Sequence, residues 1–361
     1  MKVLKFGGTS VGSAQRMKEV AKLIADGERK IVVLSAMSGT TNTLVEISDY
    51  LYKKNPEGAN EIINKLESKY RQHIDELFAT PEYKQKGLEL IKSHFDYIRS
   101  YTKDLFTLFE EKVVLAEGEL ISTAMMNYYL QECGVKSVLL PALEYMRTDK
   151  NAEPDPVYIK DKLQIQLELY SDAEIYITQG YICRNAYGEI DNLQRGGSDY
   201  TASLIGAAID ASEIEIWTDI DGMHNNDPRI VDKTAPVRHL HFEEAAELAY
   251  FGAKILHPTC IQPAKYANIP VRLLNTMDPT APGTLISNDT EKGKIKAVAA
   301  KDNITAIKIK SSRMLLAHGF LRKVFEIFES YQTSIDMICT SEVGVSVSID
   351  NVKHLNEILD D

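Results

Sequence analysis

The chain has 361 residues, of which 44% are apolar and 26% are charged, and its formal net charge is −11. This length predicts two or three domains with a substantial core, and the acidic balance excludes an ordinary nucleic-acid binder. No window approaches the roughly 18 consecutive apolar residues of a membrane span, and no signal-peptide pattern occurs, so we expect a cytoplasmic protein. The four cysteines form no CxxC motif, as expected for reduced thiols.

The chain begins with a short apolar strand, a glycine loop and a helix pattern. Val3 and Leu4 predict a buried strand, a Gly-Gly pair follows it, and a helix is expected from about Ser13. Glycines let the backbone approach a phosphate, free N–H groups face its negative charge, and Lys5 adds a cation. The segment is not a Walker loop, and a plain structural turn is the alternative interpretation.

Further apolar runs predict buried strands that alternate with helical patterns. Such an order is typical of a largely parallel sheet that is covered on both faces. Residues 42 to about 132 differ, because they are polar, favour helices and contain few glycines, so we expect a helical insertion there. Residues 183–193 predict a hairpin around Gly188. The expected strands are 31–34, 137–140, 175–178, 214–217 and 271–274.

The pattern changes after about residue 295. Alternating and helical apolar spacings follow one another in the order strand, helix, strand, strand, helix. This order predicts a small ferredoxin-like unit without its last strand. Such a sheet has an unpaired edge, which a partner chain or a longer chain would complete.

A second glycine segment contains Arg195, Gly196, Gly197, Ser198 and Asp199 and precedes a helix pattern. Ser198 suits the N-cap, and Asp199 suits the first turn of that helix. A guanidinium beside two glycines at a helix start can bind a carboxylate or phosphate through two parallel hydrogen bonds. A simple helix cap is the alternative.

Polar groups also follow other predicted strands. Thr218 and Asp219 close one strand, and Ser35 begins a run of small hydroxyl residues after another. Lys254 follows a helix pattern, where a surface cap of the helix end is the alternative. Because open α/β sheets bind ligands outside the carboxyl ends of their strands, we expect these groups to share one crevice. Residues 117–119 lie in a helical stretch, where a solvated face is expected.

Six segments of the chain together form a distinctive set: Lys-Phe-Gly-Gly-Thr-Ser-Val, Gly-Glu-Leu, Arg-Gly-Gly-Ser-Asp-Tyr-Thr-Ala, Trp-Thr-Asp, Asp-Pro-Arg and Phe-Gly-Ala-Lys-Ile-Leu-His-Pro. In this set the chain resembles the aspartokinase family, most closely its lysine-sensitive, monofunctional members. The segments follow the family's order at compatible spacing, and the resemblance covers essentially the whole chain. It implies a three-layer αβα amino-acid-kinase fold over residues 1–295 and a partial ACT regulatory domain over residues 296–361.

The resemblance also implies a reaction, in which the side-chain carboxylate of L-aspartate attacks the γ-phosphate of Mg-ATP. A carboxylate with a pKa of about 4 is already a competent nucleophile at neutral pH, so catalysis needs positioning and charge stabilisation. Magnesium is expected mainly on the ATP phosphates, and the His239/His241 pair predicts no metal site. The alternatives are an amino-acid sensor without turnover, or a kinase for glutamate, carbamate or a nucleotide.

The family's site residues map onto this chain position by position. As catalytic groups the resemblance implies Lys5, Asp199 and Lys254. As ATP-binding residues it implies Lys5, Phe6, Gly7, Gly8, Ser10, Thr218, Asp219, His224, Arg229, Lys254 and Ile255. As aspartate-binding residues it implies Ser35, Thr41, Glu119, Arg195 and Ser198, with Glu119 holding the ammonium group and Arg195 pairing with a carboxylate.

The resemblance further implies L-lysine as an inhibitor and pairing of ACT units in a homodimer or higher oligomer. The implied effector residues are Met314, Gly319, Phe320, Ser334, Ile335, Asp336, Thr340, Ser341 and Glu342. The chain departs from the family's pattern at three places. His224 stands where a nucleotide-contacting tyrosine is usual, the loop at 147–155 is shorter, and the chain ends within the first ACT unit.

Overall fold

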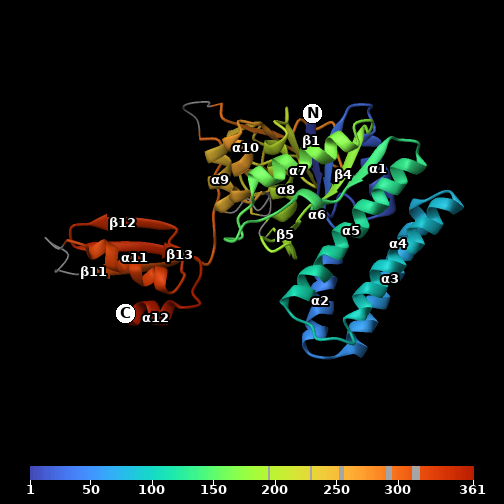
Figure 1. Ribbon diagram of the computed structural model, residues 1–361. Coiled ribbons are helices and arrows are strands. Elements are labelled where there is room, and N and C mark those ends of the chain that lie inside the picture. Colours follow the sequence, from blue (N-terminus) through green and yellow to red (C-terminus); the bar gives the residue numbers. More distant parts are fainter. Residues whose placement is uncertain (194–195, 228–229, 252–255, 290–294, 311–317) are drawn as a thin grey trace. The chain divides into compact units, whose positions relative to one another are not determined.

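The computed structural model describes residues 1–193, 196–227, 230–251, 256–289, 295–310 and 318–361 (Figure 1). The chain divides into two compact units, Met1–Ala299 and Ala300–Asp361. Within the described ranges, the main sheet of the first unit contains eight strands. They lie in the order β3 (Ser137–Leu140), β4 (Ile175–Gln179), β2 (Lys30–Leu34), β1 (Lys2–Phe6), β7 (Ile214–Thr218), β9 (Val271–Asn275), β10 (Thr284–Ser287) and β8 (His239–His241).

The main sheet is parallel except where β10 runs antiparallel to β9. Side chains alternate between its two faces, as the pleat requires. On β1, Leu4 and Phe6 pack into one hydrophobic cluster, whereas Val3 packs into the other. The predicted three-layer fold with a mainly parallel sheet is therefore confirmed.

Helices cover both faces of this sheet. α1, α2 and α5 pack on the face that carries Leu4 and Phe6, and α7, α8 and α10 pack on the opposite face. A short hairpin of β5 (Ile182–Arg184) and β6 (Ile190–Asn192) follows β4. The helices of this unit are α1 (Ala14–Ile24), α2 (Thr40–Tyr52), α3 (Pro56–Leu77), α4 (Pro81–Ser100), α5 (Leu108–Glu132), α6 (Ala142–Tyr145), α7 (Pro156–Leu169), α8 (Gly197–Ala208), α9 (Phe242–Tyr250), the 3-10 turn η1 (Pro258–Ile261) and α10 (Gln262–Tyr266).

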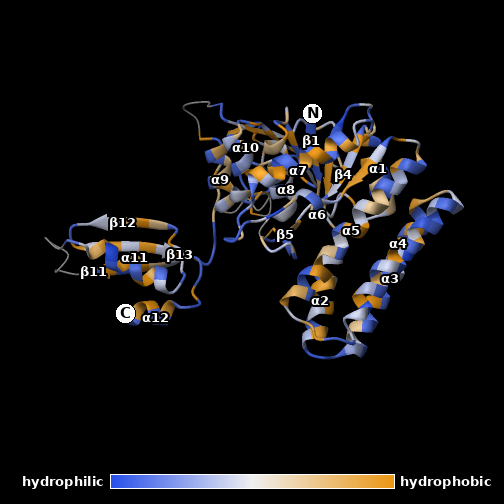
Figure 2. Cartoon of the chain, viewed as in Figure 1, coloured by the Kyte–Doolittle hydropathy of each residue, from blue (hydrophilic) through white to orange (hydrophobic). Residues whose placement is uncertain are grey.

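The helical insertion expected over 42–132 consists of α2, α3, α4 and α5. Its helices begin at local signals: Asn55 and Thr80 cap α3 and α4 just before a proline, and Thr107 forms a capping box with Glu110 at the start of α5. Figure 2 shows hydrophobic and hydrophilic residues interspersed along α2, α3 and α4, as expected for helices with one buried face.

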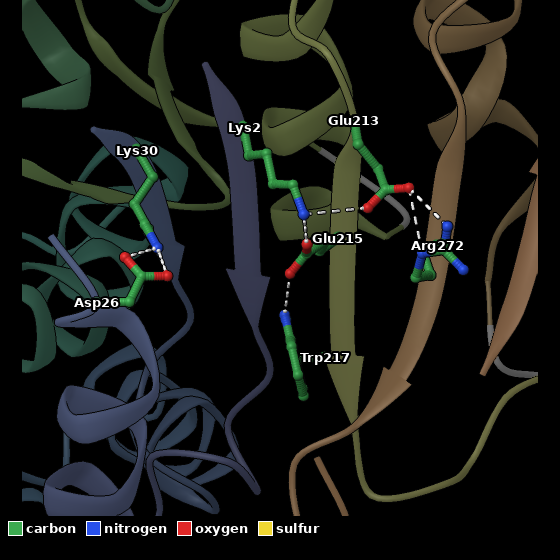
Figure 3. A network of polar contacts seen from close by, with 7 residues as sticks. All are labelled: Lys2, Asp26, Lys30, Glu213, Glu215, Trp217 and Arg272. Carbon is green, nitrogen blue, oxygen red and sulfur yellow. Dashed lines mark hydrogen bonds and ion pairs between the residues drawn. The ribbon is translucent and has the colours of Figure 1, made fainter. Parts of the chain in front are cut away.

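A polar network joins the amino ends of the central strands (Figure 3). The Lys2 ammonium donates to Glu215 at 2.7 Å and pairs with Glu213 at 3.5 Å, and Glu213 accepts from the Arg272 guanidinium at 2.9 Å. Glu215 also accepts from the Trp217 indole N–H at 3.0 Å. These bonds connect β1, β7 and β9. They lie away from the carboxyl ends of the strands, and it is at the carboxyl ends that the ligand site is expected.

The second unit is a small antiparallel sheet with helices. Its strands lie in the order β11 (Thr305–Lys310), β13 (Gly344–Ile349) and β12 (Met337–Ser341), and its helices are α11 (Phe320–Ser330) and α12 (Leu355–Asp360). Val324, Phe328 and Ile358 pack against the apolar side of the sheet. The element order matches the expected ferredoxin-like pattern, and β12 is an exposed edge strand.

Two local expectations are wrong. α8 is capped by Gly196 with a left-handed φ of +70°, and Ser198 instead lies inside the first turn, where its hydroxyl meets Ser35. Glu117 and Glu119 do not form a solvated face, since both are buried where α5 packs against neighbouring elements. Glu117 forms a hydrogen bond with His94 of α4.

Candidate active site

A cavity of about 380 Å³ lies at the carboxyl ends of β1, β2 and β4. Residues that are far apart in the sequence, from Lys5 to Asp199, meet there, as expected for an open α/β sheet. Its described lining is Lys5, Gly8, Ser35, Ala36, Met37, Ser38, Gly39, Thr41, Asn42, Glu119, Tyr181, Gly196, Gly197, Ser198 and Asp199.

Two helix N-termini line this cavity. α2 starts after Gly39 and α8 starts after Gly196, and both glycines have a left-handed φ, of +83° and +70°. Neither helix start has a side-chain cap. Backbone N–H groups at the helix starts and the positive ends of two helix dipoles favour an anion, such as a carboxylate or phosphate.

Close backbone packing shapes the cavity at Gly8 and Gly180. A Cβ atom on Gly8 would lie 2.8 Å from the Ala36 carbonyl oxygen, and one on Gly180 would lie 2.4 Å from the Ser198 hydroxyl. Either contact is shorter than a real Cβ atom tolerates. These glycines therefore let the loop after β1 and the start of α8 approach their neighbours.

Lys5 and Asp199 form an ion pair inside the site. The Lys5 ammonium lies 2.7 Å from Asp199 Oδ1, and the two side chains are only 12% and 13% exposed. A Cβ atom on Gly7 would lie 3.5 Å from Lys5 Nζ, so this ammonium lies beside the glycine loop. Asp199 thus fixes the direction of a cation that can meet a phosphoryl group.

Glu119 places a buried carboxyl group on the cavity wall. Its Oε1 accepts a hydrogen bond from the Ala36 N–H at 3.2 Å, whereas Oε2 has no hydrogen-bond partner among the described residues. Burial raises the pKa of this carboxyl to about 8, and the Ala36 N–H only partly opposes that effect. A buried carboxyl with a free oxygen is suited to receive a cationic group of a ligand.

Hydroxyl groups and one aromatic ring complete the cavity. The Ser35 hydroxyl donates to the Ser198 hydroxyl at 2.9 Å, and Thr41 lies in the first turn of α2. Tyr181, which sequence reasoning missed, lines the cavity with a φ of +70°, and burial raises its pKa to about 12. A Gly-Tyr pair directly after β4 repeats the strand–glycine pattern of the other site segments and could have identified it.

The expected nucleotide residues fall into two groups. Thr218 ends β7, and Asp219 and His224 follow it; the imidazole nitrogens of His224 lie 2.6 Å from Asp221 Oδ1 and 2.7 Å from the Thr234 hydroxyl. Phe6 and Ser10, in contrast, are fully buried. Phe6 stacks on Trp217 and the Ser10 hydroxyl bonds to Thr276, so these two residues can offer a ligand only their backbone.

Several expected residues lie outside the described part of the chain. They are Arg195, Arg229, Lys254, Ile255 and Met314. Among the residues that the structure describes, no group of three or more His, Cys, Asp or Glu side chains could hold a metal ion. His239 bonds to Ser287, and His241 caps α9.

Most of the described effector residues expected in the second unit lie near the two ends of β12. Thr340 and Ser341 end the strand, Glu342 follows, and Gly344 pairs with both Ser341 and Lys310. Gly319 and Phe320 begin α11. The other described effector residues, Ser334, Ile335 and Asp336, come directly before the start of β12. There the Asp336 N–H donates to the Ser348 carbonyl at 2.8 Å.

Comparison with known proteins agrees with this geometry. Residues 1–275 match the model of the amino acid kinase family. The chain is 38% identical over 363 residues to aspartokinase 1, chloroplastic, of Arabidopsis thaliana, covering 97% of this chain but only 63% of that protein. It is 35% identical over 353 residues to the lysine-sensitive aspartokinase 3 of Escherichia coli, covering 96% of this chain and 78% of that protein.

A solved structure is similar over nearly the whole chain. The crystal structure of E. coli aspartokinase III in complex with aspartate and ADP matches with a TM-score of 0.83 and 34% identity, over 97% of this chain and 79% of that one. In the described ranges, no helix has the length and apolar character needed to cross a membrane.

Proposed function

Because the chain belongs to the amino acid kinase family and, within it, to the aspartokinases, we propose that it phosphorylates the side-chain carboxylate of L-aspartate with ATP. The products are 4-phospho-L-aspartate and ADP. The observation that carries the proposal is the cavity itself. It combines the buried carboxyl of Glu119 with the Lys5 ammonium and two uncapped helix N-termini, which suits a ligand that carries an ammonium group and several negative charges.

The reaction needs no general base in this scheme. A carboxylate oxygen of aspartate attacks the γ-phosphorus of ATP, the bond from that phosphorus to the bridging oxygen breaks, and the electron pair leaves with ADP. Lys5 stabilises the negative charge of the transferred group, and Asp199 keeps the Lys5 ammonium in place. Glu119 binds the substrate ammonium, with Ser35, Thr41 and Ser198 beside it.

The remaining contacts are assigned from the resemblance. Arg195 would hold a carboxylate of aspartate, and Lys254 would supply a second ammonium near the ATP phosphates. The nucleotide would lie along the loop at Gly7 and Gly8, at Thr218, which ends β7, and at the later residues Asp219, His224, Arg229 and Ile255. Magnesium would arrive on the phosphates, since it usually keeps few protein ligands beside substrate phosphates.

We assign catalysis to residues 1–295 and regulation to residues 296–361, with L-lysine as the effector. The support is the exposed edge of β12. If two copies paired antiparallel along this edge, Asp336 of one copy would approach Ser341 and Glu342 of the other. Carboxylates there suit the ammonium groups of lysine. The reaction would take place in the cytoplasm.

A coupled ADP-release assay tests the function. L-Aspartate, L-glutamate and L-homoserine are compared, each with and without L-lysine, and hydroxylamine traps any acyl phosphate. We expect ADP release that depends on aspartate and decreases with lysine, with one hydroxamate formed per ADP. Binding of aspartate without any aspartate-dependent turnover would instead identify an amino-acid sensor.

A further inference from the structure

The turn Ser38–Thr40 forms the start of α2 and part of the cavity wall. Gly39 provides the left-handed residue of this turn, and no side chain caps the helix. The Ser38 N–H donates to the Gly8 carbonyl at 3.1 Å, which holds the turn on its β1 side. The position of this helix start therefore depends on what supports its other side.

Two consecutive residues of α3 provide that support. The buried hydroxyls of Tyr70 and Thr40 lie 2.9 Å apart, and the Lys69 ammonium donates to the Ser38 carbonyl at 3.1 Å. Tyr70 is fully buried, and its ring centroid lies 5.7 Å from that of Phe95 on α4. The hydroxyl of Tyr70 is thus fixed by the packed core of the insertion, and Thr40, only 1% exposed, depends on it.

We propose that the helical insertion positions the aspartate side of the cavity, with Tyr70 and Lys69 holding the Ser38–Thr40 turn. The inference rests on the proposed function, and it assigns to α3 the role of positioning the residues that bind aspartate. Neither residue lines the cavity, so both are positioning residues. Removing the Tyr70 hydroxyl leaves the Thr40 hydroxyl buried without that partner. The start of α2 then shifts so that the Thr40 hydroxyl reaches another hydrogen-bond partner. Small shifts of a binding group at a site are costly for substrate positioning.

The experiment compares Tyr70→Phe with a matched loss of a buried tyrosine hydroxyl elsewhere. Tyr145 supplies the control, because its hydroxyl lies 2.6 Å from that of Thr178 inside the core and it does not line the cavity. Thermal unfolding, kcat and the KM values for aspartate and ATP are measured. Tyr70→Phe should raise the KM for aspartate about five- to twentyfold with the KM for ATP within twofold, and Tyr145→Phe should change neither KM.

Thr40→Val removes the other partner of the same hydrogen bond and should reproduce the effect of Tyr70→Phe. The double variant should show no further rise, since both substitutions remove one interaction. Lys69→Met should raise the KM for aspartate, and Lys69→Arg, which can still donate to the Ser38 carbonyl, should restore it.

The results separate the inference from the function on which it rests. An active wild-type enzyme whose KM for aspartate is unchanged by Tyr70→Phe rejects the inference alone, as does an equal rise in Tyr145→Phe. Additive effects of Tyr70→Phe and Thr40→Val also reject it. A wild-type protein without aspartate-dependent turnover rejects the proposed function and, with it, this role of α3.

Discussion

The ammonium of Lys5 lies 2.7 Å from the carboxylate of Asp199, where the end of β1 meets the start of α8. The two residues come from distant parts of the chain, and their side chains are largely shielded from water. An ion pair in such a place is costly, because both charges give up hydration, and only a close, well-oriented contact offsets that cost. In the proposed reaction, the pair holds one cation ready for the phosphoryl group.

Lys5→Ala should lower kcat by about 10²- to 10⁴-fold, because a preorganised charge at the transferred group is lost. Asp199→Asn should lower kcat less, by about ten- to a hundredfold, because the ammonium remains but is less well held. Steady-state kinetics measures both, and circular dichroism checks the fold. Lys65→Ala, which removes an exposed lysine of α3 paired with Glu61, is the control and should leave kcat unchanged. Near-normal turnover of Lys5→Ala would remove this lysine from the mechanism.

Aspartate binding should depend on pH through Glu119. The pKa of this buried carboxyl is raised to about 8, so at pH 7 it is mostly protonated in the empty site. An ammonium ligand favours the ionised form, and the KM for aspartate should therefore fall between pH 7 and pH 9 while a proton is released on binding. Calorimetry in two buffers of different ionisation enthalpy measures that proton. Glu119→Gln should weaken binding and lose this pH dependence; proton release that persists in the variant would contradict the assignment.

The same carboxyl should affect the stability of the ligand-free protein. Its pKa is higher in the folded state than the ordinary value of 4.5. Its contribution to stability is complete below pH 4.5 and is lost as the pH rises through about 8. At pH 8 to 9, Glu119→Gln should therefore raise the free energy of unfolding by about 2–4 kcal/mol. Urea denaturation at pH 5 and pH 8.5 measures the difference, and an equal effect of the substitution at both values would count against a buried, protonated Glu119.

Gly180→Ala should damage both the fold and the site, because the new Cβ atom would meet the Ser198 hydroxyl at 2.4 Å. The expected loss of stability is about 1–3 kcal/mol, and the KM for aspartate should rise as α8 is displaced. Gly188→Ala is the matched control: the hairpin leaves open space there, so only the left-handed backbone is strained. That control should lose about 1 kcal/mol and retain normal kinetics. Identical kinetics in the two variants would show that the close approach at Gly180 is not needed.

The exposed strand β12 should mediate self-association. Met337 and Ile338 are large apolar residues with 63% and 42% of their surface exposed on this edge. Ile338→Lys should shift the protein towards the monomer in sedimentation velocity and reduce inhibition by lysine, with aspartate turnover retained. Ile304→Lys, at an exposed position before β11, is the control. A dimer that survives Ile338→Lys and remains sensitive to lysine would place the interface elsewhere.

The main sheet could be predicted because its strands are short apolar runs separated by helical patterns. Val3, Ile31 and Ile175 all lie in strands that local periodicity identifies. The glycine loop after β1 and the glycines before α8 pointed to the cavity, since each follows or precedes a recognisable element. Such signals are local. They predict the structure correctly wherever the local preference of a segment is the same as the conformation that tertiary packing requires.

The parts that could not be predicted depend on tertiary packing. Ser198 has the right chemistry for an N-cap, yet its hydroxyl meets Ser35 and a left-handed Gly196 begins the helix. The local pattern alone placed Glu119 on a solvated helix face, whereas the resemblance assigned it to the substrate ammonium; its burial involves a contact with a loop more than eighty residues earlier in the chain. Tyr181 was missed because a φ of +70° is rare for an aromatic residue, so the Gly-Tyr pair after β4 was not recognised as part of the site.

A crystal structure of this chain with L-aspartate and a non-hydrolysable ATP analogue tests the central claim most directly. The account predicts aspartate in the cavity, with its ammonium about 3 Å from Glu119 Oε2, its side-chain carboxylate facing the γ-phosphate, and the Lys5 ammonium beside that phosphate. Aspartate bound outside this cavity, or within it but out of reach of both Glu119 and Lys5, would contradict the account.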